Sequence, residues 1–272
     1  MKKLFMLVGV MLLGVLAACG GSDSNDDVTV VTVGVVGAFQ DQWDVVNEYL
    51  EPYQIRVDLV NFSDFATPNP ALHDGEIDLN AFQNQGFLNN AMATNGYDLT
   101  PIGQTFVAPL NIFANFDRIS SLEDLAPGDE VGIPSDLTNG GRALKVLEAA
   151  GLIAMDPAVG YLGTEADIMD NPSGIVIVPA ESGTLANMLP DLAAAVINSG
   201  NARTGGLDLE ADSIFLEDAL NLVIADDLIN VIVARTEEAD SDIFARIVEA
   251  YQTAAVARAI EASFGGIAAF DY

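Results

Sequence analysis

The feature that most constrains this chain is a regular alternation of short apolar runs and amphipathic segments. The first run, VTVVTVGVVG (28–37), is rich in valine and ends in glycine, which is typical of a buried parallel strand. The segment QDQWDVVNEYL (40–50) then has apolar residues at helical spacing, and IRVDLV (55–60) is a second strand. Strand, helix and strand in this order predict a βαβ unit.

The same alternation continues along the rest of the chain. Further strands are predicted at 77–82, 130–134, 174–180, 193–198 and 228–235. Further helices are predicted at 68–75, 87–97, 120–128, 138–151, 184–192 and, as a long C-terminal tail, 238–264. Alternation of this kind predicts an α/β fold with mainly parallel sheets.

Two extended segments bear on how the chain is divided. The folded part could form one wide sheet or two smaller ones, and residues 99–114 and 228–235 are suited to be crossovers between two lobes. In that arrangement lobe 1 contains residues 28–112 and 228–272, and lobe 2 contains 113–227. Ligands of open α/β sheets bind at the carboxyl ends of strands, so polar residues there are candidates for a site.

The N-terminus predicts export and a lipid anchor. The basic MKK is followed by the apolar LFMLVGVMLLGVLAA (4–18), which is too short to span a membrane comfortably and suits a signal peptide at 1–18. The only cysteine, Cys19, completes LAAC, which resembles a lipobox whose cysteine is lipidated; the alternative is an ordinary signal peptide with an incidental cysteine. Residues 19–27 would then be a lipidated cysteine and a flexible tether. We expect the protein on the extracytoplasmic face of the cell membrane.

The charge of the chain excludes some partners. With 40 acidic and 10 basic residues, the formal net charge is −30. Phosphate binding needs basic patches, so we expect no nucleic acid as a partner. The same acidity argues against a surface that adheres to anionic lipid headgroups.

Arg142 is the most conspicuous candidate for a binding residue. The strand at 130–134 runs through a turn into a helix that is expected to begin near Thr138 or Asn139, which puts Arg142 in its first turn. Backbone N–H groups of a helix start and a guanidinium together bind a carboxylate or phosphate well. The alternatives are a solvated arginine or one paired to a nearby aspartate such as Asp136.

Two further groups of residues follow predicted strands. Asn198 stands at the end of the strand 193–198, where its carboxamide can accept from an ammonium or donate to a carboxylate. The alternative is a turn-forming asparagine before Ser-Gly. Phe82 follows a predicted strand end and Phe87 begins the next helix, and Phe65 could join them to line an apolar slot. The alternative is that these rings belong to the core.

Recognisable catalytic and metal-binding motifs do not occur in the sequence. The only histidine is His73, and the chain has no Gly-x-Ser-x-Gly elbow, no phosphate-binding loop and no His/Cys cluster. Asp136 and Glu181 are the nearest candidates for an acid or base, and neither has a partner in the sequence. We therefore expect no enzyme activity, no cofactor and no metal.

Five motifs together are similar to one family, and the likeness extends from the first strand to the C-terminal helix. They are NFSDFATPNPALHDGEIDLNAFQN (61–84), GQTFVAPL (103–110), VGIPSDLTNGGRALKVLEAAGLI (131–153), AVIN (195–198) and NVIVAR (230–235). The sequence thus resembles the NlpA/MetQ-type lipoproteins, the methionine-binding receptors of ABC importers. The resemblance implies a periplasmic-binding-protein-like fold: two α/β lobes joined by two crossover strands, with the ligand in the cleft.

The resemblance also implies roles for individual residues. An arginine matching Arg142 grips the ligand carboxylate, and asparagines matching Asn198 and Asn230 hold the polar end of the amino acid, with help near Asn139. The remaining members of the implied site are Phe65, Phe82 and Phe87 around the thioether, and Asn84 beside them. Aromatic rings suit a thioether because sulfur makes favourable contacts with them.

The chain departs from the family at the side-chain end of the site. The family often has tyrosine where Phe65 and Phe87 stand and histidine where Asn84 stands, so this slot is more apolar. We expect a monomeric, lipid-anchored binding protein that captures L-methionine and delivers it to the permease and ATPase of an ABC importer. The alternatives are a receptor for another apolar amino acid or a methionine-containing peptide, an enzyme on the same fold, and a surface adhesin or sensor.

Overall fold

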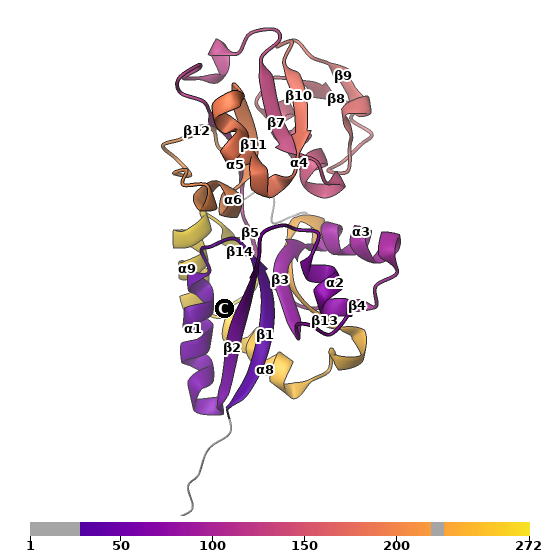
Figure 1. The fold of residues 1–272 in the computed structure, drawn as a ribbon, viewed down its shortest axis with the longest axis vertical. Coiled ribbons are helices and arrows are strands. Elements are labelled where there is room, and N and C mark those ends of the chain that lie inside the picture. The colour runs from indigo at the N-terminus through magenta and orange to yellow at the C-terminus, as the bar shows by residue number, and fades with distance from the viewer. Residues whose placement is uncertain (1–27, 219–225) are drawn as a thin grey trace, which may run out of the picture.

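The computed structural model describes residues 28–218 and 226–272, which form two α/β lobes (Figure 1). The predicted signal peptide at 1–18 and the predicted lipidated cysteine and tether at 19–27 lie outside the described residues. Within the part of the chain that the structure describes, no helix has the length and apolar character needed to cross a membrane.

Lobe 1 is built on a five-stranded sheet of order β2-β1-β3-β13-β4. Its strands are β1 (Thr29–Val36), β2 (Ile55–Phe62), β3 (Leu79–Asn84), β4 (Leu99–Gln104) and β13 (Asn230–Arg235). β1 pairs in parallel with β2 and β3, whereas β13 is antiparallel to both of its neighbours, β3 and β4. Four strands therefore run in one direction and β13 runs in the other.

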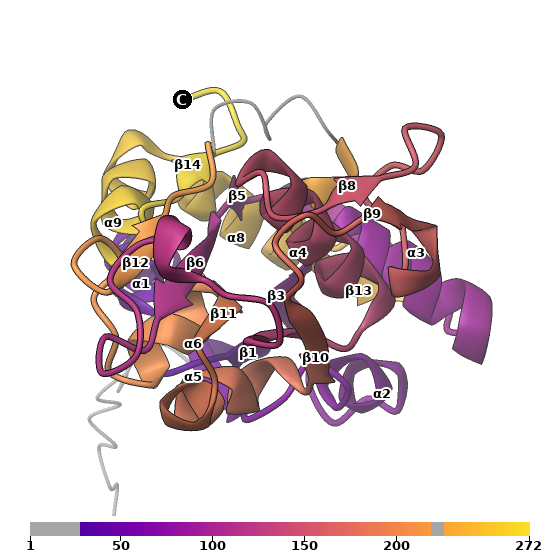
Figure 2. The same cartoon turned by 90° about the horizontal axis from the view of Figure 1, so that it is seen from above.

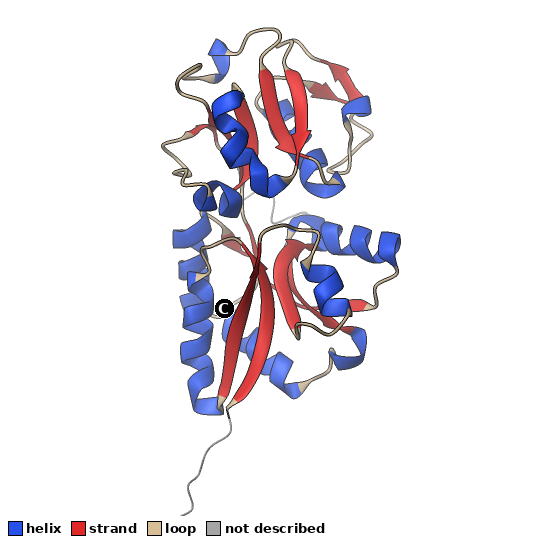
Figure 3. Ribbon diagram, in the orientation of Figure 1, coloured by secondary structure: helices blue, strands red, loops and turns tan. Residues whose placement is uncertain are grey.

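Helices cover both faces of this sheet (Figures 1 and 3). One face carries α1 (Asp41–Leu50), α8 (Asp242–Tyr251) and α9 (Ala254–Phe264), and the other carries α2 (Pro68–His73) and α3 (Gln85–Asn95). β13 packs against the helices on both faces of the sheet. Its Ile232 and Ala234 pack towards α1, while Val231 and Val233 pack towards α2. A strand that is apolar on both faces is what a buried parallel-type sheet requires.

Lobe 2 repeats this plan with a sheet of order β10-β7-β11-β6-β12. Its strands are β6 (Leu110–Ala114), β7 (Glu130–Pro134), β10 (Val176–Ala180), β11 (Ala194–Asn198) and β12 (Ser213–Phe215). β7 is parallel to β10 and β11, whereas β6 is antiparallel to β11 and β12. Helix α4 (Leu137–Ala149) covers one face, and α5 (Leu185–Met188) and α6 (Ser199–Thr204) cover the other (Figure 2).

In each sheet the reversed strand is the one that the chain reaches from the other lobe. The chain leaves the first sheet after β4 and enters the second through β6; it returns through β13. β6 begins at Leu110, so residue 112, the expected edge of lobe 1, falls inside a strand of the second sheet. The short strand β5 (Phe106–Val107) lies between the sheets and pairs with β14 (Ile267–Ala268).

This reversal determines which strand ends face the other lobe. The amino ends of β6 and β13 lie beside the carboxyl ends of the parallel strands, because antiparallel partners run in opposite directions. Asn198 at the end of β11 is paired with Leu110 at the start of β6, and Asn84 at the end of β3 with Asn230 at the start of β13. The predicted two-lobed α/β fold with mainly parallel sheets is confirmed.

Several predicted elements differ from the observed ones. The helical tail 238–264 is two helices, because Thr253 interrupts it and its hydroxyl accepts the Val256 N–H at 3.4 Å as the cap of α9. The helix expected at 120–128 is a single 3₁₀ turn with a Ser121–Asp124 capping box. β3 ends two residues later than predicted.

The remaining short elements are β8 (Ala154–Met155), β9 (Ile168–Asp170), η1 (Glu51–Tyr53), η2 (Leu122–Asp124), η3 (Glu165–Asp167), η4 (Ser182–Thr184), η5 (Leu189–Asp191), η6 (Asp226–Leu228) and η7 (Thr236–Glu238).

Helix α4 begins earlier than its sequence indicated. Its cap is Asp136, whose Oδ1 accepts the Asn139 N–H at 2.9 Å, and the helix starts at Leu137 and not at residue 138 or 139. Arg142 consequently lies in the second turn, so the expectation that it occupies the first turn is wrong. The helix ends at a glycine: Gly151 has φ +76°, and its N–H and that of Leu152 close the last turn in a Schellman motif.

The two glycines before Arg142 let α4 approach its surroundings closely. A Cβ on Gly140 would lie 2.7 Å from the carbonyl oxygen of Pro134. A Cβ on Gly141 would collide with the carbonyl oxygen of Tyr161 and would lie 2.8 Å from that of Gly163. Backbone atoms cannot move aside as a flexible side chain can, so these glycines fix the depth at which the next residue, Arg142, is placed.

We predict that Gly141→Ala destabilises the protein by about 1–3 kcal/mol, because the added methyl group overpacks this contact. The sign of the change in unfolding free energy is informative, because helix propensity alone would make the alanine variant more stable by about 0.5–1 kcal/mol. The matched control is Gly160→Ala, where a Cβ would meet nothing within 4 Å. Denaturant unfolding measures both variants, and equal stabilities would contradict the proposed role of Gly141.

Candidate functional site

The predicted site residues converge on a cavity of about 90 Å³ between the lobes. All of them line it, namely Phe65, Phe82, Asn84, Phe87, Asn139, Arg142, Asn198 and Asn230. They come from both lobes and from positions up to 165 residues apart; most of them lie at or after the carboxyl ends of parallel strands, and Asn230 begins the reversed strand β13. The cavity therefore has one wall from each lobe.

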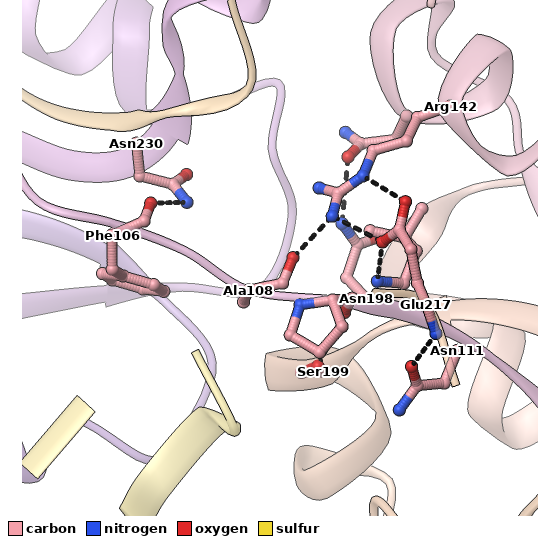
Figure 4. A network of polar contacts seen from close by, with 11 residues as sticks. Phe106, Ala108, Asn111, Arg142, Asn198, Ser199, Glu217 and Asn230 are labelled. Carbon is pink, nitrogen blue, oxygen red and sulfur yellow. Dashed lines mark hydrogen bonds and ion pairs between the residues drawn. The ribbon is translucent and has the colours of Figure 1, made fainter. Parts of the chain in front are cut away.

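Arg142 is buried, with 4% of its surface exposed, and its carboxylate partner is Glu217 (Figure 4). Its Nε donates to Oε1 of Glu217 at 3.1 Å and its Nη2 donates to Oε2 at 2.6 Å. Nη2 also donates to the carbonyl oxygen of Ala108 at 2.7 Å. Arg142 is thus neither solvated nor paired to Asp136, the two alternatives that its sequence context allowed.

One edge of the guanidinium remains available to a ligand. Among the described residues no hydrogen bond reaches Nη1 of Arg142, which carries two N–H groups. Figure 4 shows this nitrogen turned away from Glu217, towards the side of the cavity where Asn230 and Phe106 lie. Arg142 can therefore bind an anion through Nη1 while it keeps its pair with Glu217.

Glu217 is held in place by backbone groups as well as by Arg142. The Leu110 N–H donates to its Oε2 at 2.7 Å, and its own N–H donates to Oδ1 of Asn111 at 3.1 Å. The sequence did not reveal this residue, because Glu217 lies 75 positions from Arg142 in a chain with 40 acidic residues. The only signal was that a buried arginine needs a counter-charge, and burial is not visible in sequence.

Asn198, Asn139 and Asp136 form a chain of hydrogen bonds along the lobe 2 wall. Nδ2 of Asn198 donates to Oδ1 of Asn139 at 2.9 Å, and Nδ2 of Asn139 donates to both carboxylate oxygens of Asp136 at 3.1 Å. Within residues 28–218 and 226–272, the buried Oδ1 of Asn198 has no partner. The Oδ1 atom of Asn198 is thus available to accept a hydrogen bond from a ligand.

The two asparagines of lobe 1 have different roles. Nδ2 of Asn230 donates to the carbonyl oxygen of Phe106 at 2.8 Å, and no hydrogen bond from a described residue reaches its Oδ1. Oδ1 of Asn84 instead accepts the Phe87 N–H at 2.8 Å, as the N-cap of α3. Asn230 therefore presents a second acceptor, whereas the oxygen of Asn84 is engaged in starting the helix that carries Phe87.

Three phenylalanines form the apolar part of the cavity wall. The ring centroids of Phe65, Phe82 and Phe87 lie 5.9–6.3 Å from one another, in tilted and edge-to-face arrangements. All three are half-buried, so they are not core residues. Phe82 lies within β3, and the expectation that it follows the strand is wrong by the two residues by which β3 is displaced.

A local turn positions Phe65. Oδ1 of Asp64 accepts from the Thr67 hydroxyl at 2.7 Å and from the N–H groups of Thr67 and Ala66 at 2.8 and 2.9 Å. These hydrogen bonds, the one from the Thr67 hydroxyl above all, hold the pKa of Asp64 below its ordinary value despite partial burial. The ionised carboxylate consequently keeps the loop folded at neutral pH.

Some lining residues were not singled out from the sequence. Phe106 of β5 and Phe264 of α9 stack with centroids 5.1 Å apart beside the cavity. Asp136, a candidate for acid or base chemistry, has its oxygens engaged by Asn139 and Ser182, and Glu181 is exposed. No group of three or more His, Cys, Asp or Glu residues in the described ranges is placed to hold a metal.

Two α/β lobes that meet over a small cavity, with polar groups and aromatic rings drawn from both sides, define the class of a substrate-binding protein. Comparison with known proteins identifies the family. A model of the NlpA lipoprotein family matches residues 31–269, which is most of the chain. The chain belongs to the NlpA lipoprotein family, and this places it among the substrate-binding proteins of ABC transporters and not among enzymes.

Individual relatives agree with this assignment. A protein of Salmonella typhimurium named D-methionine-binding lipoprotein MetQ is 38% identical over 268 residues, which cover 97% of this chain and 96% of the relative. The crystal structure of the methionine-binding protein MetQ superposes with a TM-score of 0.82 at 36% identity, covering 89% of this chain and 99% of that one. A nutrient-binding protein from Burkholderia cenocepacia bound to methionine gives 0.79 at 30% identity, covering 88% and 100%.

We predict that Glu217→Ala destabilises the protein by about 3–5 kcal/mol, because it leaves the buried charge of Arg142 unpaired. The double variant Arg142→Met with Glu217→Leu removes both charges and is expected to be more stable than Glu217→Ala. Urea unfolding measures each variant. The control is Asp58→Ala, which breaks an exposed ion pair with Arg56 and is expected to cost at most about 1 kcal/mol. A Glu217→Ala protein as stable as this control would contradict the argument.

Proposed function

We propose that this protein captures L-methionine in the cavity between its lobes and delivers it to the permease and ATPase of an ABC importer. We further propose that Cys19 carries a lipid that anchors it on the extracytoplasmic face of the membrane. The names of the relatives support the ligand, the transporter and the lipoprotein character. The polarity of the cavity supports an amino acid independently of those names.

That polarity is the observation that carries the proposal. Nη1 of Arg142 offers two N–H donors with a positive charge, and Oδ1 of Asn198 and Oδ1 of Asn230 offer two acceptors. A zwitterionic amino acid has the complementary groups, because its carboxylate only accepts and its ammonium only donates. The ligand carboxylate would bind Arg142, and its ammonium would bind the two carboxamide oxygens.

The Phe65, Phe82 and Phe87 rings suit the thioether side chain of methionine. They form an apolar wall, and sulfur makes favourable contacts with aromatic rings. This chain has phenylalanine where hydroxyl groups would be available from tyrosine, so selectivity at this end would rest on shape and polarisability. An apolar amino acid other than methionine is the second candidate for the same reason.

The contacts come from both lobes, which suggests how delivery is coupled to binding. Arg142 and Asn198 belong to lobe 2, whereas Asn230 and the three phenylalanines belong to lobe 1. A ligand held by both walls stabilises the closed arrangement relative to an open one, and the permease can then recognise the closed state. The crossover around β5 is a segment about which the lobes would move.

We predict that the purified protein binds L-methionine in calorimetric titrations and that Arg142→Lys weakens this binding by about 10- to 100-fold. Lysine keeps a positive charge beside Glu217 but cannot reach both Glu217 and the ligand as a planar fork does. The control is Arg56→Lys, which changes an exposed arginine outside the cavity. Unchanged affinity in Arg142→Lys would contradict the carboxylate role, and tight binding of another amino acid without methionine binding would reassign the ligand.

We predict that Cys19→Ala moves the protein from the membrane fraction to the soluble fraction of the cells that express it. Mass spectrometry of the wild-type protein is expected to show residue 19 as the N-terminus with attached acyl chains. The control is Ser22→Ala, a change in the same segment that leaves the cysteine. Retention of Cys19→Ala in the membrane fraction would count against a lipid anchor at this position.

A further inference from the structure

The unpaired carbonyl oxygen of Asn198 raises the question of what fixes its orientation. A carboxamide can turn by 180° and exchange its oxygen for its NH₂ group, which would reverse the polarity of the site. Oδ1 of Asn198 is buried and has no partner in the described parts of the chain, so local contacts of that oxygen do not hold it. The restraint must act through the other side of the carboxamide, Nδ2.

The chain of hydrogen bonds supplies this restraint in two steps. The carboxylate of Asp136 can only accept, so Asn139 must turn Nδ2 towards it, which it does with contacts of 3.1 Å to each oxygen. Asn139 then necessarily presents Oδ1 to Asn198, which must answer with Nδ2, at 2.9 Å. Turning either carboxamide would bring two acceptors together in a buried place, which is costly.

Asp136 is itself held firmly and does not line the cavity. Its Oδ1 accepts the Asn139 N–H at 2.9 Å as the cap of α4, and its Oδ2 accepts from the Ser182 hydroxyl at 3.3 Å. The first contact ties the carboxylate to the backbone of lobe 2, and the second ties it to a side chain of the same lobe. Any influence of Asp136 on a ligand is therefore transmitted through Asn139 and Asn198.

We propose that Asp136 is a positioning residue that sets the polarity of the site by directing the carbonyl oxygen of Asn198 towards the ligand. The site thereby selects a ligand with a cationic or neutral N–H donor at this point and disfavours one that lacks it. The proposal rests on the proposed function, since it assigns the selected donor to the ammonium of an amino acid. It adds a residue that touches no ligand atom to the determinants of specificity.

The test compares two ligands on the Asp136→Asn variant. Asparagine still caps a helix, but its side chain both donates and accepts, so Asn139 and Asn198 are free to turn. The ligands are L-methionine and 4-(methylthio)butanoate, which keeps the carboxylate and the thioether and lacks the ammonium. We expect the preference for methionine to fall about tenfold, while the affinity for the butanoate changes by less than about twofold.

The control for this measurement is Asp124→Asn, which alters another capping aspartate, one that binds Ser120 and Ser121 and does not line the cavity. It is expected to leave the ratio of the two affinities unchanged. If Asp136→Asn keeps the wild-type ratio, or weakens both ligands equally as a merely structural change would, the proposal is overturned.

A second measurement needs no ligand. The side-chain NH₂ signals of Asn139 and Asn198 in ¹⁵N-resolved NMR spectra are expected to shift in Asp136→Asn and to stay in place in Asp124→Asn. Unchanged Asn198 signals would overturn the proposal. If the wild-type protein does not bind methionine, the proposed function fails, and these spectra still decide whether Asp136 orients Asn198.

Discussion

The buried ion pair of Arg142 and Glu217 is the interaction on which the site depends. It joins helix α4 of lobe 2 to the segment that follows β12. Arg142 also donates to the carbonyl oxygen of Ala108, in the crossover from lobe 1, and Glu217 accepts the N–H of Leu110 at the start of β6. A bidentate carboxylate on Nε and Nη2 fixes the plane of the guanidinium. The remaining nitrogen is thereby aimed into the cavity without any need for the ligand to order it, which lowers the entropic cost of binding.

Strand order and strand direction together decide which residues reach the cavity between the lobes. Each sheet has four strands in one direction and one strand, β6 or β13, in the other, and the reversed strand follows a passage between lobes. The same edge of each sheet therefore collects the carboxyl ends of parallel strands and the amino end of the reversed one. Asn198 ends the parallel strand β11 and Asn230 begins the reversed strand β13, so these two asparagines reach the cavity from opposite walls and from different kinds of strand end.

What the polar side chains offer a ligand depends on how their donor and acceptor atoms are oriented, and residue type alone does not reveal it. Asn84 resembles Asn198 and Asn230 in chemistry, yet its oxygen caps α3 while theirs are unpaired among the described residues. Asp136 and Glu217 do not line the cavity, and each accepts hydrogen bonds from donors of lobe 2. Asp136 orients Asn198 through Asn139, and Glu217 orients Arg142. The two acids therefore determine the polarity of the site without lining the cavity.

Local patterns in the sequence determined most of the longer strands and the approximate extent of several helices, whereas the family likeness determined the two-lobed class and the residues that converge on the cavity. Valine-rich runs, the Schellman glycine Gly151 and the capping box at Ser121 are short-range features, so they are legible without a structure. Only the tertiary structure decided the partner of Arg142, the start of α4 at Leu137, and the orientation of Asn198. Each of these depends on which groups share a buried place: with 40 acidic residues in the chain, charge alone could not single out Glu217, 75 positions away, and burial is a property of the folded chain.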